Sequence, residues 1–551
     1  MKTFKTIAKT LLPALLLTGL TFQQSTAQQN GPDNNYVSDV WVADNGDGTY
    51  TNPILHADYS DPDVCRVGDD FYMTASSFNC VPGLPILHSK DLVNWELIAY
   101  ALYEQIPADV FETPQHGNGV WAPSIRFHEG ELYIFWGDPD FGIYYVKAKN
   151  PKGPWSKPHL VQEGKGLIDP CPLWDEDGKA YLSYAFAGSR AGLKSVVVVQ
   201  EMEADCSRLI GTPVMVFDGH DEHPTVEGTK FHKRNGYYYI FAPAGGVKPG
   251  WQLAMRARSP FGPYEVKKVL EQGSTNINGP HQGAWVETVK GESWFIHFQD
   301  KDAYGRIVHL NPVQWDNDWP LMGIDYDGNG VGEPVTTHKK PDVDAEWSVV
   351  TPVESDEFNT HQLGLQWQWH ANPKLKYGFT SGNLGYYRLN CRPRPENYVN
   401  LWPVGNLLLQ KFPAEEFTAT AKITFNHRFD GEEAGFVVMG EDYQYIALKQ
   451  VDGKLQTRVV NCEGARKGGA EKEIFSESYE GNTVYFRVEV KKGAVCSFSY
   501  SENGKRFSAA GAAFEAMPGR WIGAKVGFFA LRDGMINDAG NVDIDWIRIE
   551  K

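Results

Sequence analysis

The hydrophobic pattern between residues 49 and 340 repeats one unit, in which a polar or glycine-containing turn is followed by an aromatic-rich strand. Turns such as Asp177-Gly178 and Asn235-Gly236 tolerate the positive φ that tight hairpins require. The strands after these turns begin 61, 48, 57 and 57 residues apart, at Phe71, Leu132, Ala180, Tyr237 and Trp294. Five sheets at this spacing predict a five-bladed β-propeller over residues 49–340. A long sandwich with chance internal similarity is the alternative.

The pattern changes after a polar connector, which we place at residues 341–353. From Glu354 onward, longer runs alternate apolar and polar residues, for example in 417–425, 484–490 and 543–549. Strands with this period of two, separated by turns, predict a β-sandwich over residues 354–551. The chain is therefore expected to be all-β, with a propeller followed by a sandwich.

Composition agrees with an all-β chain and limits the kinds of partner that the chain is expected to bind. Aromatic residues make up 13% of the sequence, beside 55 Gly and 33 Pro, as expected for many short strands and turns. The formal net charge of −17 disfavours nucleic acid and anionic membranes and favours a neutral ligand. Seven cysteines without a CxxC pair indicate buried thiols, with room for one bridge, and no disulfide framework.

The N-terminus has the pattern of an export signal. Lys2, Lys5 and Lys9 precede an apolar run at 11–17, and a small-residue site follows at 25–27. The apolar run is too short to cross a membrane as a helix. We therefore predict a signal peptide at 1–27, a polar leader at 28–48, and a periplasmic or extracellular location.

Three carboxylates occupy matching places in the repeats. Asp61 and Asp169 each stand before a proline, and Glu227 stands ahead of the fourth repeat. Each precedes its strand pair by a comparable distance, so all three are expected at the same end of the central channel. Pro62 also predicts extended backbone at Asp61. The alternative for each acid alone is a solvated turn carboxylate.

Three gathered acids suit the cleavage of a glycosidic bond. One carboxylic acid must protonate the leaving oxygen, and one carboxylate must activate water. Crowding the carboxyls raises the pKa of the acid, and a third member of the group can tune that pKa. The three positions therefore predict a hydrolytic site for a sugar.

The motifs around these acids resemble those of glycoside hydrolase family 43, the five-bladed propeller hydrolases that act on xylose- and arabinose-containing glycans. The segments that carry the resemblance are Ser60-Asp-Pro-Asp-Val, Ile168-Asp-Pro-Cys-Pro and Val226-Glu-Gly-Thr-Lys-Phe. The resemblance implies that Asp61 is the general base, Asp169 the pKa modulator and Glu227 the general acid. It requires no redox cofactor.

Three further motifs carry the resemblance beyond the acids. Val120-Trp-Ala-Pro-Ser implies that Trp121 helps to wall the sugar pocket, and Gly305-Arg implies that Arg306 contacts the sugar. Arg306 could equally neutralise the carboxylates. Gly279-Pro-His places His281 near the channel axis, where some members hold a calcium ion. A single histidine is more often a structural hydrogen-bonding residue than a ligand.

The remaining resemblance concerns specificity. Residues 80–97 are similar to the β-xylosidase-like branch, and the C-terminal region looks like the concanavalin-like, jelly-roll sandwich of those enzymes. In such relatives a sandwich loop closes one side of the pocket, which implies removal of one terminal sugar. The pair Asn79-Cys80 departs from the aromatic-rich segment of typical β-xylosidases, so xylose and arabinose both stay open.

The family resemblance implies single-step hydrolysis with inversion, with the two reacting carboxyls about 6.5 to 9.5 Å apart. The substrate would be an oligosaccharide or polysaccharide such as xylan, arabinan or arabinoxylan. A carbohydrate-binding propeller without catalysis and an endo-acting arabinanase are the alternatives. A fructan-cleaving propeller is disfavoured because the sequence contains no Arg-Asp-Pro.

Overall fold

A computed structural model of the chain describes residues 36–534 and 537–551. The predicted signal peptide and the first part of the leader lie outside these residues. The described part is almost entirely strand, with one short helix, α1 (Gly188–Ala191). Its 3-10 turns are η1 (Val110–Glu112), η2 (Asp302–Tyr304), η3 (Leu375–Tyr377), η4 (Gly382–Leu384) and η5 (Ala465–Lys467). Across the described ranges, every helix is too short or too polar to cross a membrane.

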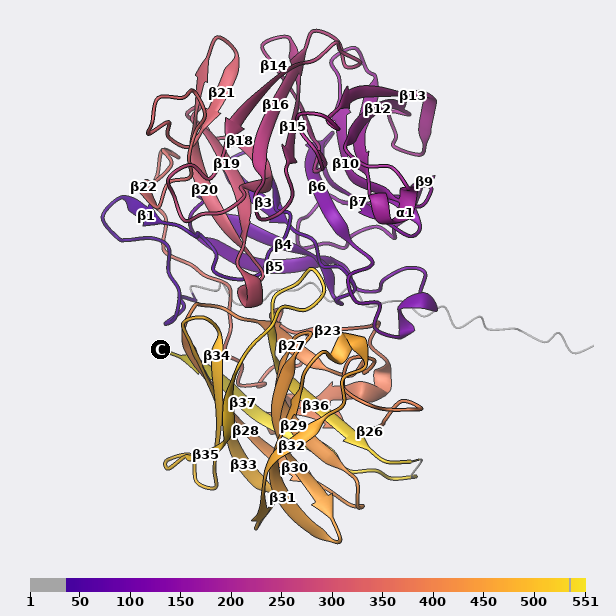
Figure 1. The fold of residues 1–551 in the computed structure, drawn as a ribbon, viewed down its shortest axis with the longest axis vertical. Coiled ribbons are helices and arrows are strands. Elements are labelled where there is room, and N and C mark those ends of the chain that lie inside the picture. Colours follow the sequence, from indigo (N-terminus) through magenta and orange to yellow (C-terminus); the bar gives the residue numbers. More distant parts are fainter. Residues whose placement is uncertain (1–35, 535–536) are drawn as a thin grey trace, which may run out of the picture. The chain divides into compact units, whose positions relative to one another are not determined.

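Five antiparallel four-stranded sheets form the predicted propeller, coloured indigo to pink in Figure 1. The first strands of the blades are β2 (Asp63–Val67), β6 (Trp121–His128), β10 (Leu167–Trp174), β14 (Lys230–Arg234) and β18 (His281–Glu287). The second strands are β3 (Asp70–Thr74), β7 (Glu131–Asp138), β11 (Ala180–Phe186), β15 (Tyr237–Ala244) and β19 (Ser293–Asp300). The third strands are β4 (Gly83–Ser89), β8 (Gly142–Ala148), β12 (Val196–Met202), β16 (Trp251–Ala257) and β20 (Arg306–Asp316). The outer strands are β5 (Trp95–Leu102), β9 (His159–Glu163), β13 (Leu209–Asp218), β17 (Glu265–Leu270) and β21 (Trp319–Met322).

The predicted five-bladed, all-β fold is confirmed, and each aromatic-rich run is the second strand of a blade. These strands are buried along most of their length, as in β7, because neighbouring blades cover both faces. The first strands β2, β6, β10 and β14 pack side by side in turn, and β18 contacts β15 of the fourth blade and returns to β2, so the ring of blades closes.

Two segments far apart in sequence close the ring. β1 (Thr49–Thr51) pairs antiparallel with β22 (Thr337–Lys339). The amide of Asn52 then donates to the carbonyls of Leu310 and Val335, and its oxygen accepts from the N–H of Leu310. A buried amide whose groups are all paired in this way fixes the start of the propeller against its last blade.

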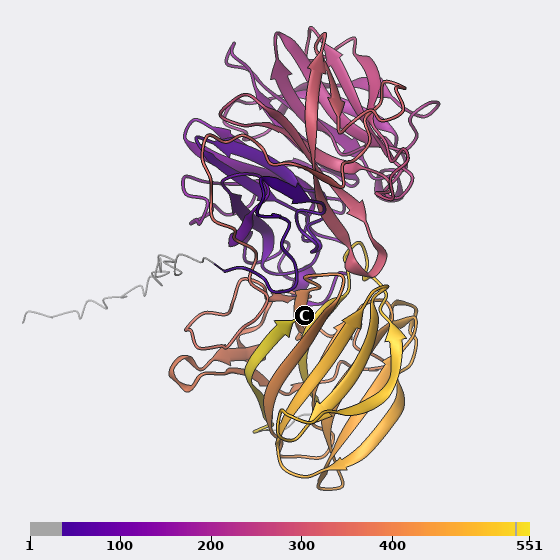
Figure 2. The ribbon, with the colours of Figure 1, turned by 90° about the vertical axis from the view of Figure 1, so that its left-hand side faces the viewer.

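The C-terminal domain is the predicted β-sandwich, drawn in orange and yellow in Figure 2. One sheet runs β23 (Gln368–Trp369), β27 (Leu408–Lys411), β36 (Lys525–Arg532), β29 (Glu433–Met439), β30 (Tyr443–Val451), β31 (Lys454–Cys462) and β32 (Lys472–Tyr479), with β26 (Arg392–Pro393) beside β36. The other runs β24 (Gly378–Thr380), β25 (Tyr387–Asn390), β37 (Asn541–Glu550), β28 (Phe417–Asn426), β33 (Thr483–Lys491), β34 (Val495–Ser501) and β35 (Ser508–Glu515). Alternate residues of β33 face the core, as the period of two predicts.

The described end of the leader, residues 36–48, packs onto the fold. Val40 and Ala43 are buried, and the Ser38 hydroxyl donates to Glu354 at 2.6 Å. All seven cysteines lie within the described residues and all are free thiols, so the bridge for which the sequence left room does not form.

Candidate active site

One pocket of about 610 Å³ collects the predicted acids at one end of the propeller channel. Asp61, Asp169 and Glu227 all line it, from blades one, three and four. Trp121 and Arg306 line it too, so five of the six predicted site residues meet there. The sixth, His281, is fully buried beside it, with its Nε2 atom 3.7 Å from Oε1 of Glu227.

The backbone at Asp61 differs from the extended conformation predicted for it, and Asp169 shares the observed conformation. Asp61 has φ of +53° and Asp169 has φ of +57°, which is the left-handed region and not the extended one. Aspartate tolerates this region better than most residues, but the following proline should disfavour it. Strained positions of this kind persist where the surrounding structure fixes them, and they cluster at functional sites.

The same backbone turn recurs in every blade, which explains why the acids meet. The matching residues are Ala122 (φ +34°), Gly228 (φ +64°) and Gln282 (φ +36°). In blades two, three and five the pairing between the first two strands shifts register at this point, as in a β-bulge. A bulge re-aims a side chain, and here the fold uses it at equivalent places around one ring. Glu227 stands one residue before its blade's turn residue.

Asp61 is held as a hydrogen-bond acceptor. Nη1 of Arg306 lies 3.1 Å from its Oδ1 atom, and the hydroxyls of Ser60 and Ser76 donate to Oδ2 at 2.9 and 2.6 Å. The Ser76 hydroxyl is oriented in turn, because it accepts from the N–H of Ala122. Three donors thus converge on the one carboxylate and fix its orientation. Arg306 thus makes the ion pair that the sequence offered as an alternative to sugar contact.

Glu227 has the opposite surroundings. Its side chain is 24% exposed toward the pocket, and the 3.7 Å to His281 is too long for a hydrogen bond. Burial, and then the charges of Asp169 and Asp61, raise the pKa of the Glu227 carboxyl to about 8. Arg306 and Lys194 oppose this shift in pKa. The carboxyl therefore keeps its proton at neutral pH.

The surroundings of Asp169 are intermediate between those of Asp61, which accepts several hydrogen bonds, and those of Glu227, which accepts none from the described residues. It is 1% exposed, and its Oδ2 atom accepts the N–H of Gly228 at 2.6 Å. Burial and the charge of Asp61 raise the pKa of the Asp169 carboxyl, whereas the Gly228 N–H and the cation of Lys230 lower it. Asp169 is therefore placed to affect the pKa of Glu227 through its charge. It is too buried to contact a substrate atom directly.

The surroundings of His281 do not fit a calcium site. Both ring nitrogens lack a hydrogen-bond partner among the described residues, and burial together with Arg306 lowers the pKa of the imidazole to about 3. Calcium prefers six to eight oxygen ligands. Within residues 36–534 and 537–551, no three His, Cys, Asp or Glu side chains come together where a metal could be held. We derive no step through a metal.

The family resemblance implied that a sandwich loop closes one side of the pocket, but the residues of that loop could not be identified from the sequence. Trp521, which precedes β36, lines the pocket and packs edge-on against Trp121 with ring centroids 6.2 Å apart. Arg306 lies 5.5 Å from the Trp521 ring. Phe78 adds a third aromatic wall and packs against Trp121. Nothing in the local sequence of Trp521 marks it as a partner of residues some 400 positions earlier.

Asp58, also missed, fixes the sandwich loop beside the pocket. Its Oδ1 atom accepts the backbone N–H of Arg306 at 2.9 Å, and its Oδ2 atom accepts that of Gly523 at 3.0 Å. The backbones of Gly305 and Gly523 approach closely here, since a Cβ on Gly305 would lie 2.7 Å from the backbone N of Gly523. One buried carboxylate thus fixes both the arginine that holds Asp61 and the loop that carries Trp521.

A propeller pocket with three carboxyls and aromatic walls defines a sugar-cleaving class of site. The comparisons with known proteins identify the class. The family model described as "Glycosyl hydrolases family 43" matches residues 50–320, and "Beta xylosidase C-terminal Concanavalin A-like domain" matches residues 355–550. The chain belongs to glycosyl hydrolase family 43 and is a glycosidase.

The similar proteins align with nearly the whole chain, and their names describe two different activities. A protein of Xylanibacter ruminicola is 39% identical over 495 residues, covering 88% of this chain and 86% of its own. The "Beta-xylosidase" of Formosa agariphila is 32% identical and covers 91% of this chain and 90% of its own. The "Non-reducing end alpha-L-arabinofuranosidase BoGH43B" of Bacteroides ovatus is 30% identical, with 90% and 94% covered. Among solved structures, BlXynB of Bacillus licheniformis matches with a TM-score of 0.79 at 27% identity, over 91% of this chain and 99% of its own.

Proposed function

We propose that the chain is an exo-acting glycosidase that removes terminal xylose or arabinose from plant cell-wall glycans by single-step hydrolysis with inversion. The observation that carries this proposal is the contrast between two carboxyls in one pocket. Asp61 is an acceptor held by a guanidinium and two hydroxyls, whereas Glu227 has surroundings that retain a proton. Two carboxyls whose environments push their protonation apart mark the base and the acid.

In the proposed mechanism Asp61 takes a proton from a water molecule, and the oxygen of that water attacks the anomeric carbon. The bond from this carbon to the leaving oxygen breaks, and Glu227 gives that oxygen its proton. Asp61 ends protonated and Glu227 ionised, so proton exchange with solvent resets the site. Asp169 supports the step by placing negative charge beside Glu227.

The aromatic walls support a pocket that takes a chain end. Phe78, Trp121 and Trp521 line it, and Trp521 comes from the sandwich domain. Aromatic faces suit the apolar faces of a neutral sugar. A wall contributed by a second domain favours removal of one terminal sugar over the open groove of an endo-acting arabinanase.

The choice between the two sugars stays open in the proposal. The similar proteins include one named a β-xylosidase and one named an α-L-arabinofuranosidase. The unusual Asn79-Cys80 pair does not line the pocket, because Asn79 donates to the carbonyl of His370 and Cys80 accepts from Lys525. The neighbouring Phe78 lines it instead.

The test is hydrolysis of nitrophenyl β-D-xylopyranoside and nitrophenyl α-L-arabinofuranoside by the full chain. We expect turnover of at least one substrate and its loss in Asp61→Ala and Glu227→Ala. Release of internal fragments from linear arabinan, with neither nitrophenyl sugar cleaved, would favour the endo-acting alternative. Unchanged oligosaccharide binding in both variants without any turnover would favour a carbohydrate-binding propeller.

A further inference from the structure

Basic side chains gather beside the aromatic wall of the pocket that holds the three carboxyls, which we call the acid pocket. Arg190 lies in α1 of blade three, Lys194 follows three residues after that helix, and Arg520 lies in the sandwich loop before β36. Lys194 lines the pocket together with Trp121 and Trp521. We call Arg190, Lys194 and Arg520 the basic rim. All three are partly or fully exposed, in a chain whose formal net charge is −17.

Two arginines of the rim stack on the two tryptophans of the wall. The Cζ atom of Arg520 lies 4.1 Å from the ring centroid of Trp521, and that of Arg190 lies 5.7 Å from the ring centroid of Trp121. The two rings are 6.2 Å apart, centroid to centroid. Stacking on an indole holds a guanidinium in place and leaves the N–H groups at its edge able to bind. The rim is therefore attached to side chains that already line the pocket.

Gly117 allows Arg520 to pack at this edge of the pocket. The carbonyl of Gly117 accepts the indole N–H of Trp121 at 2.8 Å. A Cβ on Gly117 would collide with Cγ of Arg520 and lie 3.1 Å from Cδ1 of Trp521, and the residue has φ of +81°. The close approach and the positive φ both favour glycine. The sandwich loop thus packs directly onto the propeller loop that also holds Trp121.

Two cations of the rim lack a partner within the chain. Nε of Arg190 lies 3.3 Å from Oδ1 of Asp140, and its Nη2 donates to Asn118 at 2.8 Å, so that guanidinium is engaged. Lys194 and Arg520, by contrast, make no ion pair and no side-chain hydrogen bond with any described residue. A guanidinium presents N–H donors in a fork that matches a carboxylate. Both side chains are therefore available to an anion from outside the chain.

The carboxylates closest to these two cations do not pair with them. Burial and then Arg466 lower the pKa of the Arg520 guanidinium, and Glu441 opposes them. Glu441, however, already pairs with Arg466 at 3.0 Å. Lys194 opposes the rise in the pKa of Glu227 that burial causes, but no ion pair joins the two side chains among the described residues. The surroundings of the rim therefore leave a positive excess beside the pocket.

We propose that Arg520 and Lys194 bind a carboxylate on the part of the substrate that leaves, so that the enzyme acts on oligosaccharides containing a uronic acid beside the terminal sugar. This rests on the proposed function. The terminal sugar lies among the three acids, where a carboxylate would be repelled, so an acidic group is accepted only outside them. The rim offers that outer position, next to Trp121 and Trp521. The neutral ligand that the net charge favours is then the terminal sugar and not the whole substrate.

The test compares two trisaccharides at low salt. Both are xylotriose, and one carries a 4-O-methylglucuronosyl group on its middle residue; if arabinose is preferred, both carry a terminal arabinofuranose instead. We expect the wild type to cleave the acidic trisaccharide with the higher kcat/KM. Arg520→Gln and Lys194→Gln should each lower the ratio of acidic to neutral kcat/KM by about fivefold, the upper range for an ion pair at a surface. The change should lie in KM, because the carboxylate is bound equally before and during the reaction.

The ratio is chosen because both trisaccharides need the same acid, so any effect of Lys194 on Glu227 cancels. Arg506→Gln, at an exposed arginine between β34 and β35 of the sandwich, is the matched control and should keep the wild-type ratio. Raising the ionic strength from about 0.02 to 0.5 M should lower the wild-type ratio toward that of Arg520→Gln, because salt screens exposed charges.

A wild-type ratio of one or less overturns the proposal. So does an equal loss on both trisaccharides in Arg520→Gln and Lys194→Gln, since the cations would then only support the fold or offset the pocket acids. If the variants do not fold, a wild-type ratio that salt leaves unchanged overturns it.

Failure of this inference differs from failure of the proposed function. If the folded wild type cleaves neither trisaccharide and neither nitrophenyl sugar, the proposed function fails. If it cleaves the neutral substrates and the ratio does not respond to Arg520→Gln, Lys194→Gln or salt, only the role of the basic rim is wrong.

Discussion

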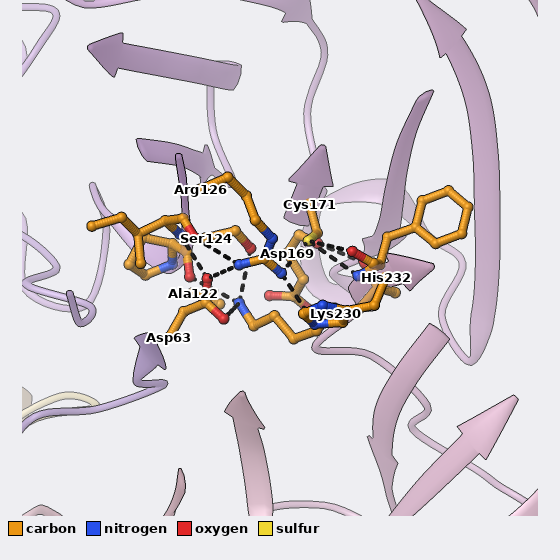
Figure 3. Close-up of polar contacts among 12 residues, drawn as sticks. Asp63, Ala122, Ser124, Arg126, Asp169, Cys171, Lys230 and His232 are labelled. Carbon is orange, nitrogen blue, oxygen red and sulfur yellow. Dashed lines mark hydrogen bonds and ion pairs between the residues drawn. The ribbon is translucent and has the colours of Figure 1, made fainter. Parts of the chain in front are cut away.

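The acid pocket and the buried ions Asp63, Arg126 and Lys230 (Figure 3) lie in the same propeller and differ in their access to solvent. Three carboxyls share the pocket with the cations Arg306 and Lys194, whereas Arg126 and Lys230 flank the single carboxylate of Asp63. The pocket reaches solvent, as the 24% exposure of Glu227 shows, but Lys230 is fully buried. The carboxyls of the pocket are therefore open to substrate and solvent, whereas Asp63 and Lys230 are closed to both.

The largest effect should come from the two reacting carboxyls. We expect Asp61→Asn and Glu227→Gln each to lower kcat/KM by about 10²- to 10⁴-fold, because general base and general acid catalysis contribute that much. Asp69→Asn and Glu222→Gln, at exposed acids close in sequence, are the matched controls and should leave kcat/KM unchanged. Activity close to that of the wild type in either pocket variant would remove the contrast between base and acid.

Asp169 should give a smaller loss with a clear pH signature. Its charge raises the pKa of Glu227, so Asp169→Asn lowers that pKa and moves the alkaline limb of the profile to lower pH. We expect a loss of about 10- to 100-fold in kcat/KM at neutral pH, measured on nitrophenyl xyloside. A variant with reduced activity and an unmoved alkaline limb would make Asp169 a packing residue only.

The pH profile of kcat/KM for the wild-type protein tests the raised pKa of Glu227 without a substitution. The protonated form of Glu227 is present below its raised pKa, so kcat/KM should be kept through neutral pH and fall as pH rises through about 8. Profiles over pH 4 to 10 on a substrate with a poor leaving group check this. A fall in kcat/KM centred near the ordinary pKa of glutamic acid would show that burial does not keep Glu227 protonated.

The sequence predicted the propeller because each blade repeats a local signal, a turn and then an aromatic-rich strand such as the one starting at Tyr237. It also placed Asp61, Asp169 and Glu227 together, since equivalent positions in a ring share one end. The positive φ of Asp61 was missed because the proline rule is local, whereas Ser76 and Arg306, which hold Asp61, lie 15 and 245 residues further along the chain. Trp521 and Asp58 were missed because their contacts cross between domains.

Substitution of Trp521, the pocket residue that the sandwich supplies, should have a smaller effect, about tenfold in KM. We expect Trp521→Ala to raise KM for the nitrophenyl sugars roughly tenfold with a smaller change in kcat, because one aromatic face of the pocket is lost. Trp347→Ala, at a tryptophan that is 41% exposed and does not line the pocket, is the control. An unchanged KM in Trp521→Ala would confine substrate binding to the propeller.

The smallest effect should come from the hydroxyl that orients Asp61. Ser76→Ala removes a 2.6 Å hydrogen bond to the base but leaves Arg306 and Ser60 in place. We expect a loss of a few-fold to about tenfold in kcat/KM, in line with the net contribution of about 0.5 to 1.5 kcal/mol for one hydrogen bond. A loss as large as that of Asp61→Asn would mean that Ser76 takes part in the reaction itself.

The stereochemistry of the first product tests the central claim most directly. Proton NMR during the first minutes of hydrolysis of a β-xyloside, or of an α-arabinofuranoside if that is the preferred substrate, reports the anomer released before mutarotation. Single-step attack by a water activated by Asp61 predicts the inverted anomer, α-xylose from the β-xyloside. Release of the anomer with the same configuration as the substrate would contradict the assignment of Asp61 as a base and of the reaction as a single step.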